Sequence, residues 1–359
     1  MSNSLKEYQS KLTDFMYSYG TPSYSFEKLA LELHEYQRQS SKVYRSLSRE
    51  SVDSWEQIPC LPISMFKHTE VTSFDREGLD LDAMVCFRSS GTTQQDKSRH
   101  YMPSLTPYRQ SIACAFDALL TDWRFVRPRV LCVSALLDRQ HSSLFEMMST
   151  LSQRSDSTVF TGLNDTQKIS KWLLDLNNAI LYTESRDLIV FGTTLALVDM
   201  SESLAEVTRE SVIVIETGGM KGRDFGILTA ADLTKKIAKK FNNTHMTFRE
   251  YGMSEMSSQL YGRVYGNEPV KYKAPPWLRY RVVDIVTGEG LPNGEEGIIQ
   301  FYDLANVYSC GFIQTEDVGV INSDSSLTLN GRARGAVEKG CSISFSQAME
   351  AVNENGRRE

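Results

Sequence analysis

The segment from Ser89 to Lys97, which reads S-S-G-T-T-Q-Q-D-K, constrains this chain more than any other part of its sequence. A run of hydroxyl and glycine residues is followed, after a short polar gap, by a lysine. Glycine lets backbone N–H groups approach an anion, the hydroxyls donate hydrogen bonds, and the lysine supplies a positive charge. The pattern indicates a loop that holds phosphate oxygens. A Ser/Thr-rich surface turn is the alternative that such composition usually means.

The nearest common phosphate loop does not fit this segment. From Gly91 the chain reads G-x-x-x-x-D-K-S, one substitution away from the Walker loop G-x-x-x-x-G-K-S. Asp96 stands where the second glycine belongs, and a carboxylate there would repel the phosphates that the loop should receive. The sequence therefore favours another kind of phosphate-binding loop.

The same segment resembles the S-S-G-T-T-G-x-P-K loop of adenylate-forming enzymes, which include acyl-CoA synthetases, peptide-synthetase adenylation domains and luciferases. Further segments follow in that family's order: Glu216–Gly219 lies at the glycine-rich adenine loop, Tyr251–Glu255 resembles Y-G-x-T-E, Thr315–Gly319 resembles T-G-D-x-G, and Gly331–Gly335 resembles the start of the G-R-x-x-D hinge. The chain departs from these patterns at Gln94, Asp96, Glu316 and Gly335. The order of the motifs identifies the chain as similar to this family.

One branch of the family is the most similar. Segments 216–222 and 334–342 resemble the acyl-protein synthetases of bacterial luminescence operons, which activate a fatty acid with ATP and place the acyl group on their own cysteine. The resemblance implies ATP and Mg²⁺ as cofactors and a carboxylic, fatty acid as substrate. It also makes an acyl-accepting protein or a reductase a candidate partner. Family members carry a C-terminal lid domain beyond the hinge, and we expect it to be absent because the chain ends at Glu359.

The resemblance also implies a role for each matching residue in an adenylation reaction, whose barrier is largely charge crowding among anions. The residues expected to hold the β- and γ-phosphates are Ser89, Ser90, Gly91, Thr92, Thr93 and Lys97. Glu255 is the expected Mg²⁺ ligand, because a carboxylate is a hard oxygen donor. The nucleotide-binding motif around the adenine is expected to comprise Gly218, Gly219, Tyr251, Gly252, Met253 and Ser254.

The remaining nucleotide contacts are expected near the hinge. Asp317 would accept hydrogen bonds from the ribose hydroxyls, since an ionised carboxylate offers only acceptors. Arg332 would contact the ribose or the developing acyl phosphate. An ordinary turn aspartate and a routine surface arginine are the alternatives.

The acyl group needs an acceptor and a pocket. A thiolate that attacks an acyl adenylate yields a thioester, and position in the family makes Cys341 the candidate. Arg334 and Lys339 lie close enough in sequence to favour its thiolate form, although an idle cysteine in a terminal segment is an equal alternative. The candidate acyl-pocket residues are His141, Phe191, Gly192 and Thr193.

Composition bounds the class of protein. The 359 residues are 23% charged and 41% apolar, as in ordinary globular proteins, and the formal charge is −6. Without a Lys/Arg-rich block, nucleic acid is not an expected partner. No apolar run reaches the length of a membrane span and the start of the chain has no signal-like apolar region, so a cytoplasmic location is the default expectation.

The order of the apolar runs predicts an α/β fold with layered, mostly parallel sheets and helices, that of the N-terminal domain of adenylate-forming enzymes. Val130–Ala135, Leu188–Thr193 and Ser211–Glu216 are predicted strands that alternate with helical stretches. Turn signals between Tyr280–Val286 and Gly297–Tyr302 predict a hairpin. We therefore expect an α/β adenylation core at 1–279, a small β-rich subdomain at 280–335, and a tail at 336–359 that carries Cys341.

Three functions remain open at this point. The first is an AMP-forming acid–thiol ligase that transfers the acyl group to Cys341. The second is a ligase that passes the acyl adenylate to CoA or a carrier protein, with a lid from a separate polypeptide. The third is a degenerate module that binds nucleotide or carboxylate without turnover, which the departures from the family motifs allow.

Overall fold

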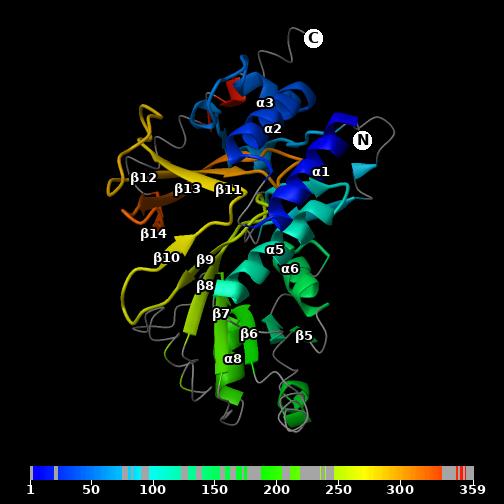
Figure 1. Ribbon diagram of the computed structural model, residues 1–359, viewed down its shortest axis with the longest axis vertical. Coiled ribbons are helices and arrows are strands. Elements are labelled where there is room, and N and C mark those ends of the chain that lie inside the picture. Colours follow the sequence, from blue (N-terminus) through cyan, green and yellow to red (C-terminus); the bar gives the residue numbers. More distant parts are fainter. Residues whose placement is uncertain are drawn as a thin grey trace. The chain divides into compact units, whose positions relative to one another are not determined.

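The structure is a computed structural model, and it divides the chain into two compact units (Figure 1). Unit 1 comprises residues 1–114, 253–259 and 273–359, and unit 2 comprises 115–252 and 260–272. The structure describes residues 3–19, 23–74, 80–81, 84–89, 97–122, 128–134, 140–153, 158–161, 167–171, 174–175, 187–203, 211–218, 235, 239, 246–333, 345–346, 348–350 and 352.

Unit 1 begins with three helices, α1 (Asn3–Tyr17), α2 (Phe26–Ser40) and α3 (Lys42–Leu47), which lie together at the top of Figure 1. Helix α2 starts at Ser25, whose side chain caps the helix by accepting from the Lys28 N–H. Phe26, Leu29 and Leu33 recur at three- and four-residue steps and are buried, so this face forms part of the core. The short elements η1 (Trp55–Gln57), β1 (Leu61–Pro62) and α4 (Met65–His68) follow.

Two antiparallel arrangements complete unit 1. Strands β11 (Leu278–Val283), β12 (Glu296–Asp303), β13 (Phe312–Ile321) and β14 (Leu327–Arg332) are neighbours in chain order, and β1 adds a parallel pairing to β13. Strands β2 (Val85–Arg88) and β3 (Arg99–Met102) form a separate two-stranded sheet. Trp277, Phe301 and Phe312 are fully buried among these strands. The predicted hairpin between 280 and 302 is confirmed by the pairing of β11 with β12.

Unit 2 contains a mostly parallel sheet in the order β5-β4-β6-β7-β8-β9-β10. These strands are β4 (Arg129–Ser134), β5 (Thr158–Thr161), β6 (Asp187–Thr193), β7 (Ser211–Thr217), β8 (Met246–Tyr251), β9 (Leu260–Arg263) and β10 (Lys271–Lys273). The strands from β5 to β8 pair in parallel, and β9 pairs antiparallel with β8. In Figure 1, β6, β7 and β8 lie side by side.

The burial pattern of unit 2 explains its parallel sheet. Leu188, Ile189, Val190 and Phe191 of β6 are all completely buried, and such continuous burial is typical of strands covered on both faces. Helix α6 (Ser143–Ser152) packs on β4 and β5, and α8 (Thr194–Ser203) packs on β4, β6 and β7. Helix α5 (Thr106–Asp122) begins in unit 1 and ends in unit 2. The predicted strands at 130–135, 188–193 and 211–216 are confirmed.

The predicted domain boundaries at 279 and 335 stay a prediction. The two compact units are divided at other points, after residues 114, 252, 259 and 272. The strands of 280–335 share unit 1 with the N-terminal helices. Most of the predicted tail at 336–359 lies outside the described residues. Among the helices that the structure describes, none combines the length and apolarity needed to cross a membrane.

Candidate active site

The predicted site residues belong to both compact units. Unit 1 holds Ser89, Lys97, Met253, Ser254, Glu255, Asp317 and Arg332, and unit 2 holds His141, Phe191, Gly192, Thr193, Gly218, Tyr251 and Gly252. Ser90, Gly91, Thr92, Thr93, Gly219 and Cys341 lie outside the described residues.

The two ends of the predicted phosphate loop are held together in unit 1. Strands β2 and β3 pair so that Arg88 stands opposite Arg99. Beyond that pair, the Ser89 N–H donates to the Ser98 carbonyl over 3.3 Å, and the Ser98 N–H donates to the Ser89 hydroxyl over 3.1 Å. Lys97 follows the loop and is half-buried. The hairpin therefore fixes the points at which the loop leaves and returns.

The segment around Glu255 contacts both ends of this hairpin. The Ser98 hydroxyl donates to Oε1 of Glu255, and the Ser254 hydroxyl donates to the Arg88 carbonyl over 3.3 Å. Glu255 is buried, with an exposed fraction of 6%. Two motifs that lie more than 150 residues apart in the chain are thus in direct contact.

Buried side chains also hold the backbone of this segment. His100 Nδ1 lies 2.8 Å from the Ser254 carbonyl oxygen, and Asn306 Nδ2 donates to the Glu255 carbonyl over 2.8 Å. The Asp303 carboxylate accepts from the N–H groups of Ser257 and Ser258 over 2.7 and 2.9 Å. Because each of these contacts satisfies a backbone group away from water, the position of Glu255 is fixed by side chains from β3 and from the end of β12.

The electrostatics of this support follow from its burial. Burial lowers the pKa of His100 to about 4, so the imidazole is neutral at pH 7. A carbonyl oxygen can only accept, so Nδ1 of His100 carries the hydrogen and Nε2 faces the Ser309 hydroxyl at 3.0 Å. Burial raises the pKa of Asp303 to about 6, against the lowering effect of its hydrogen bonds to Ser258 and to backbone N–H groups.

The sequence interpretation missed His100, Asp303 and Asn306. The signal that could have identified Asp303 is an acidic residue directly after the apolar run that ends at Tyr302. No comparable sequence signal marks His100, because its role depends on contacts with residues far along the chain.

Asp317 and Arg332 also lie together in unit 1. They are register partners on β13 and β14, with Arg332 Nε 3.5 Å from Asp317 Oδ1. Arg332 Nη1 is 3.7 Å from Glu316 Oε2, and the arginine side chain is 65% exposed. The arginine of this pair is thus exposed, whereas the Asp317 side chain is only 18% exposed. Contact of the pair with a ribose stays a prediction.

The nucleotide-motif residues of unit 2 lie at the carboxyl ends of parallel strands, where α/β sheets commonly bind ligands. Gly218 directly follows β7 and has φ +72°, a left-handed conformation that favours glycine. Tyr251 ends β8, and its ring centroid is 6.1 Å from that of Tyr272. Gly252 is exposed, whereas Met253 of unit 1 accepts a turn hydrogen bond from the Met256 N–H over 3.1 Å.

The candidate acyl-pocket residues of unit 2 have structural explanations. A Cβ on Gly192 would lie 2.5 Å from the Val133 carbonyl oxygen, so this glycine permits close packing and leaves no room beside it. Phe191 is completely buried in the core. The Thr193 hydroxyl accepts from the Ala196 N–H over 3.3 Å at the start of α8, and His141 is a half-buried residue next to Ser142, the N-cap of α6. Their role in an acyl pocket stays a prediction.

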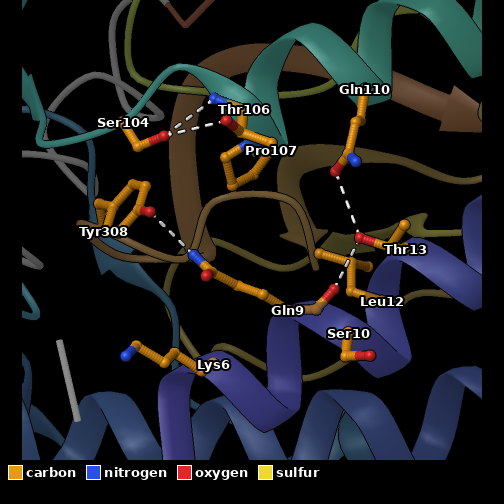
Figure 2. Close-up of a pocket in the computed structure, with 10 residues that line it drawn as sticks. All are labelled: Lys6, Gln9, Ser10, Leu12, Thr13, Ser104, Thr106, Pro107, Gln110 and Tyr308. Carbon is orange, nitrogen blue, oxygen red and sulfur yellow. Dashed lines mark hydrogen bonds between the residues drawn. The ribbon is translucent and has the colours of Figure 1, made fainter. Parts of the chain in front are cut away.

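A cavity of about 360 Å³ lies elsewhere in unit 1, and Figure 2 shows its lining. Gln9 Nε2 donates to the Tyr308 hydroxyl over 2.9 Å, and the Thr13 hydroxyl donates to Gln110 Oε1 over 3.3 Å. The other lining residues are Lys6, Ser10, Leu12, Ser104, Thr106 and Pro107. None of the predicted site residues that the structure describes lines this cavity, so it is separate from the candidate active site.

The described part of the chain contains buried cysteines and no cluster of side chains that could hold a metal ion. Cys86, Cys114 and Cys132 are buried and form no disulfide with another described cysteine, which suits small core residues. Within the described ranges, no group of three or more His, Cys, Asp or Glu side chains could hold a metal ion. A single carboxylate with substrate phosphates is nevertheless a donor set that suits Mg²⁺, and Glu255 fits that role.

Similarity to known proteins decides the family. Residues 169–350, just over half of the chain, match the acyl-protein synthetase family LuxE. The chain belongs to this family. The resemblance that the motifs indicated is therefore confirmed.

Two relatives of the acyl-protein synthetase family carry the same name, long-chain-fatty-acid–luciferin-component ligase. The chain is 20% identical to that of Aliivibrio fischeri over 375 aligned positions, which cover 95% of each chain. It is 32% identical to that of Vibrio harveyi over 93 residues, which cover 24% of each chain. This second match therefore spans much less than the whole relative.

Solved structures confirm the fold. The chain is similar to 2-hydroxyisobutyryl-CoA ligase in complex with 2-HIB-AMP and CoA, with a TM-score of 0.58, 13% identity, and coverage of 85% of this chain and 69% of that chain. ATP-bound MatB from Rhodopseudomonas palustris matches with a TM-score of 0.48 and 19% identity, over 72% of this chain and 50% of MatB. The chain thus spans half the length of MatB. The predicted α/β fold of adenylate-forming enzymes is confirmed by the first of these structures together with the parallel sheet of unit 2.

Proposed function

We propose that this chain is an AMP-forming ligase that activates a carboxylic acid, of the fatty-acid class, and transfers the acyl group to a thiol. The single observation that carries the proposal is the contact of the Glu255 segment with both ends of the phosphate-loop hairpin, through Ser98 and Arg88. Membership of the acyl-protein synthetase family and the names of its relatives support the substrate class.

The first reaction step joins the acid to AMP. A carboxylate oxygen attacks the α-phosphorus of ATP, the bond from that phosphorus to the bridging oxygen breaks, and pyrophosphate leaves. Every reactant is an anion, so the protein must position them and neutralise charge. Lys97 supplies a positive charge at the end of the phosphate loop, and Ser89 supplies a hydroxyl at its start. Bound Mg²⁺ would neutralise phosphate charge, and Glu255 is the residue that would hold it.

The second step moves the acyl group to sulfur. A thiolate attacks the acyl carbon, the bond from that carbon to the phosphate oxygen breaks, and AMP leaves. We propose Cys341 as the sulfur donor, on the strength of its place in the family pattern. This residue lies outside the described part of the chain.

Exchange of labelled pyrophosphate into ATP tests the first step. The exchange should require a fatty acid, and Lys97→Ala and Glu255→Gln should each lower its rate by at least about 100-fold, as loss of one group that stabilises a charged transition state does. Lys28→Ala on the exposed side of α2 is the matched control and should exchange at the wild-type rate. Absence of exchange in the wild-type protein with carboxylates of every chain length would refute the proposal and favour a non-catalytic binding module.

Acylation by radiolabelled fatty acid and ATP tests the second step. We expect label on the denatured wild-type protein, released by hydroxylamine as a thioester, and no label on Cys341→Ala. Cys114→Ala, which alters a buried cysteine, is the control and should keep the label. A labelled Cys341→Ala protein would exclude this acceptor. Acyl-CoA formed by a wild-type protein that itself carries no label would instead favour transfer to CoA or a carrier.

A further inference from the structure

A buried hydrogen-bonded cluster lies at the carboxyl ends of β6, β7 and β8 in unit 2. Thr194, the first residue of α8, is 1% exposed, and Glu216 of β7 is 4% exposed. The Thr194 hydroxyl lies within hydrogen-bond distance of two acceptors, Glu216 Oε1 and, at 3.0 Å, the Gly218 carbonyl oxygen, so its one hydrogen is shared between them. Arg249 of β8 pairs with Glu216, with Nε 3.0 Å from Oε2. Two neighbouring strands and the first residue of α8 thus contribute to one contact with Gly218.

The cluster explains how a carboxylate can be buried at this edge of the sheet. A buried carboxylate is costly unless it is paired and hydrogen-bonded. The Arg249 guanidinium supplies the opposite charge for Glu216, and the Thr194 hydroxyl supplies a donor. Arg249 holds one carboxylate oxygen of Glu216, and the other oxygen contacts the Thr194 hydroxyl. The ion pair therefore also restrains the Thr194 side chain.

Gly218 has two different sides. Its carbonyl is held from within by Thr194. A Cβ built on Gly218 would meet no described atom within 4 Å, and its φ of +72° is one that other residues adopt only with strain. The glycine is also exposed. A flat group can therefore approach the backbone here, while the carbonyl cannot rotate away without breaking the Thr194 contact.

We propose that Thr194, held by Glu216 and Arg249, is a positioning residue that orients the Gly218 turn for the adenine base of ATP. This inference rests on the proposed function. It assigns Thr194 to nucleotide recognition, although its neighbours Phe191 to Thr193 were expected to line an acyl pocket. The two assignments differ in which substrate should respond to a change at this residue.

Thr194→Val separates them, because valine keeps the shape of threonine and removes the hydroxyl. We expect KM for ATP to rise about 5- to 10-fold, as for the loss of one hydrogen bond, and KM for the fatty acid to stay unchanged. The preference for ATP over GTP in pyrophosphate exchange should fall by the same factor, since only the base is read by this turn. Thr194→Ser retains the hydroxyl and should restore the wild-type values. Thr150→Val is the matched control, because this hydroxyl bonds only locally to the Glu146 carbonyl of α6 among the described contacts, and it should leave both constants unchanged.

Three outcomes would overturn the inference while leaving the proposed function intact. The first is an unchanged KM for ATP in an active Thr194→Val protein. The second is an equal rise in KM for the fatty acid. The third is an equal loss with ATP and GTP, which would indicate a general loosening of the sheet edge. If Thr194→Val does not fold by circular dichroism, Arg249→Gln provides the same test, since it weakens the hold on Glu216. Absence of exchange in the wild-type protein would instead refute the proposed function itself.

Discussion

Two buried carboxylates, Asp303 in unit 1 and Glu250 in unit 2, show how differently the two units use a charged group. Asp303 is completely buried and accepts from the N–H groups of Ser257, Ser258 and Ala305 and from the Ser258 hydroxyl. Glu250 is 8% exposed, and the bond described for it comes from the Thr217 hydroxyl. Asp303 therefore organises backbone, whereas Glu250 contacts a side chain that can rotate to another partner.

The difference shows which buried acids the fold depends on. A backbone N–H that loses its partner in the interior has no alternative, because the chain around it is fixed. A hydroxyl that loses its partner can turn. We therefore expect the Glu255 segment to depend strongly on Asp303, and β8 to depend only weakly on Glu250.

The largest effect is expected for Asp303→Ala. It leaves buried donors at 257, 258 and 305 without their partner, and unfolding in urea should show a loss of about 3–5 kcal/mol. The rate of pyrophosphate exchange should fall as well, because Asp303 holds Ser257 and Ser258, which directly follow Glu255. Asp284→Ala is the matched control: this turn aspartate also accepts from two backbone N–H groups, at Val286 and Thr287, but its site is exposed. Water can replace its carboxylate, so a loss as large as that of Asp303→Ala would contradict the comparison.

The intermediate effect concerns the pH dependence of Glu250. Burial raises its pKa from 4.5 to about 7, so the folded protein holds this proton more tightly than the unfolded chain does. The contribution of Glu250 to the free energy of unfolding is therefore present below about pH 4.5 and is lost as the pH rises through about 7. Glu250→Gln removes this dependence. We subtract the free energy of unfolding of the wild type from that of Glu250→Gln at each pH. This difference should be larger at about pH 8 than at about pH 5, by about 1–3 kcal/mol.

Urea unfolding of both proteins at about pH 5 and about pH 8 measures that difference. Glu289→Gln, at an exposed turn, is the control and should differ from wild type by the same amount at both values. A Glu250→Gln protein that behaves like the control would show that Glu250 is not buried as a neutral acid.

Local patterns in the sequence predicted the elements of the fold well. The run Leu188–Thr193 predicts a strand, and the structure extends this strand by one residue to Asp187. Ser142 caps the start of α6 by accepting from the Phe145 N–H, a contact between residues three apart in the chain. These elements depend on neighbours in the chain, so the sequence contains the information directly.

The candidate site was predictable only where a motif marks it. Ser254 and Glu255 were identified from their motif, and the structure places them against the hairpin ends. His100 and Asp303 carry no motif, because their roles arise from contacts with residues 154 and about 45 positions away. Gly192 is a different case: it was expected to line an acyl pocket, and the close packing of Val133 and Leu197 around it could only be seen in three dimensions.

The smallest effect is expected at a third carboxylate, Asp317, whose partner Arg332 is 65% exposed. A single ion pair at 3.5 Å whose arginine is largely in water gains little over solvation, so Arg332→Met should change the free energy of unfolding by less than about 0.5 kcal/mol. Arg279→Met provides the contrast in the same unit. The Arg279 guanidinium lies 4.4 Å from the Phe26 ring centroid and 5.2 Å from that of Trp55, and loss of this stacking should cost about 1 kcal/mol. Urea unfolding at neutral pH ranks the two variants. If Arg332→Met proves the more destabilised, stacking on aromatic rings would not be what separates these two exposed arginines.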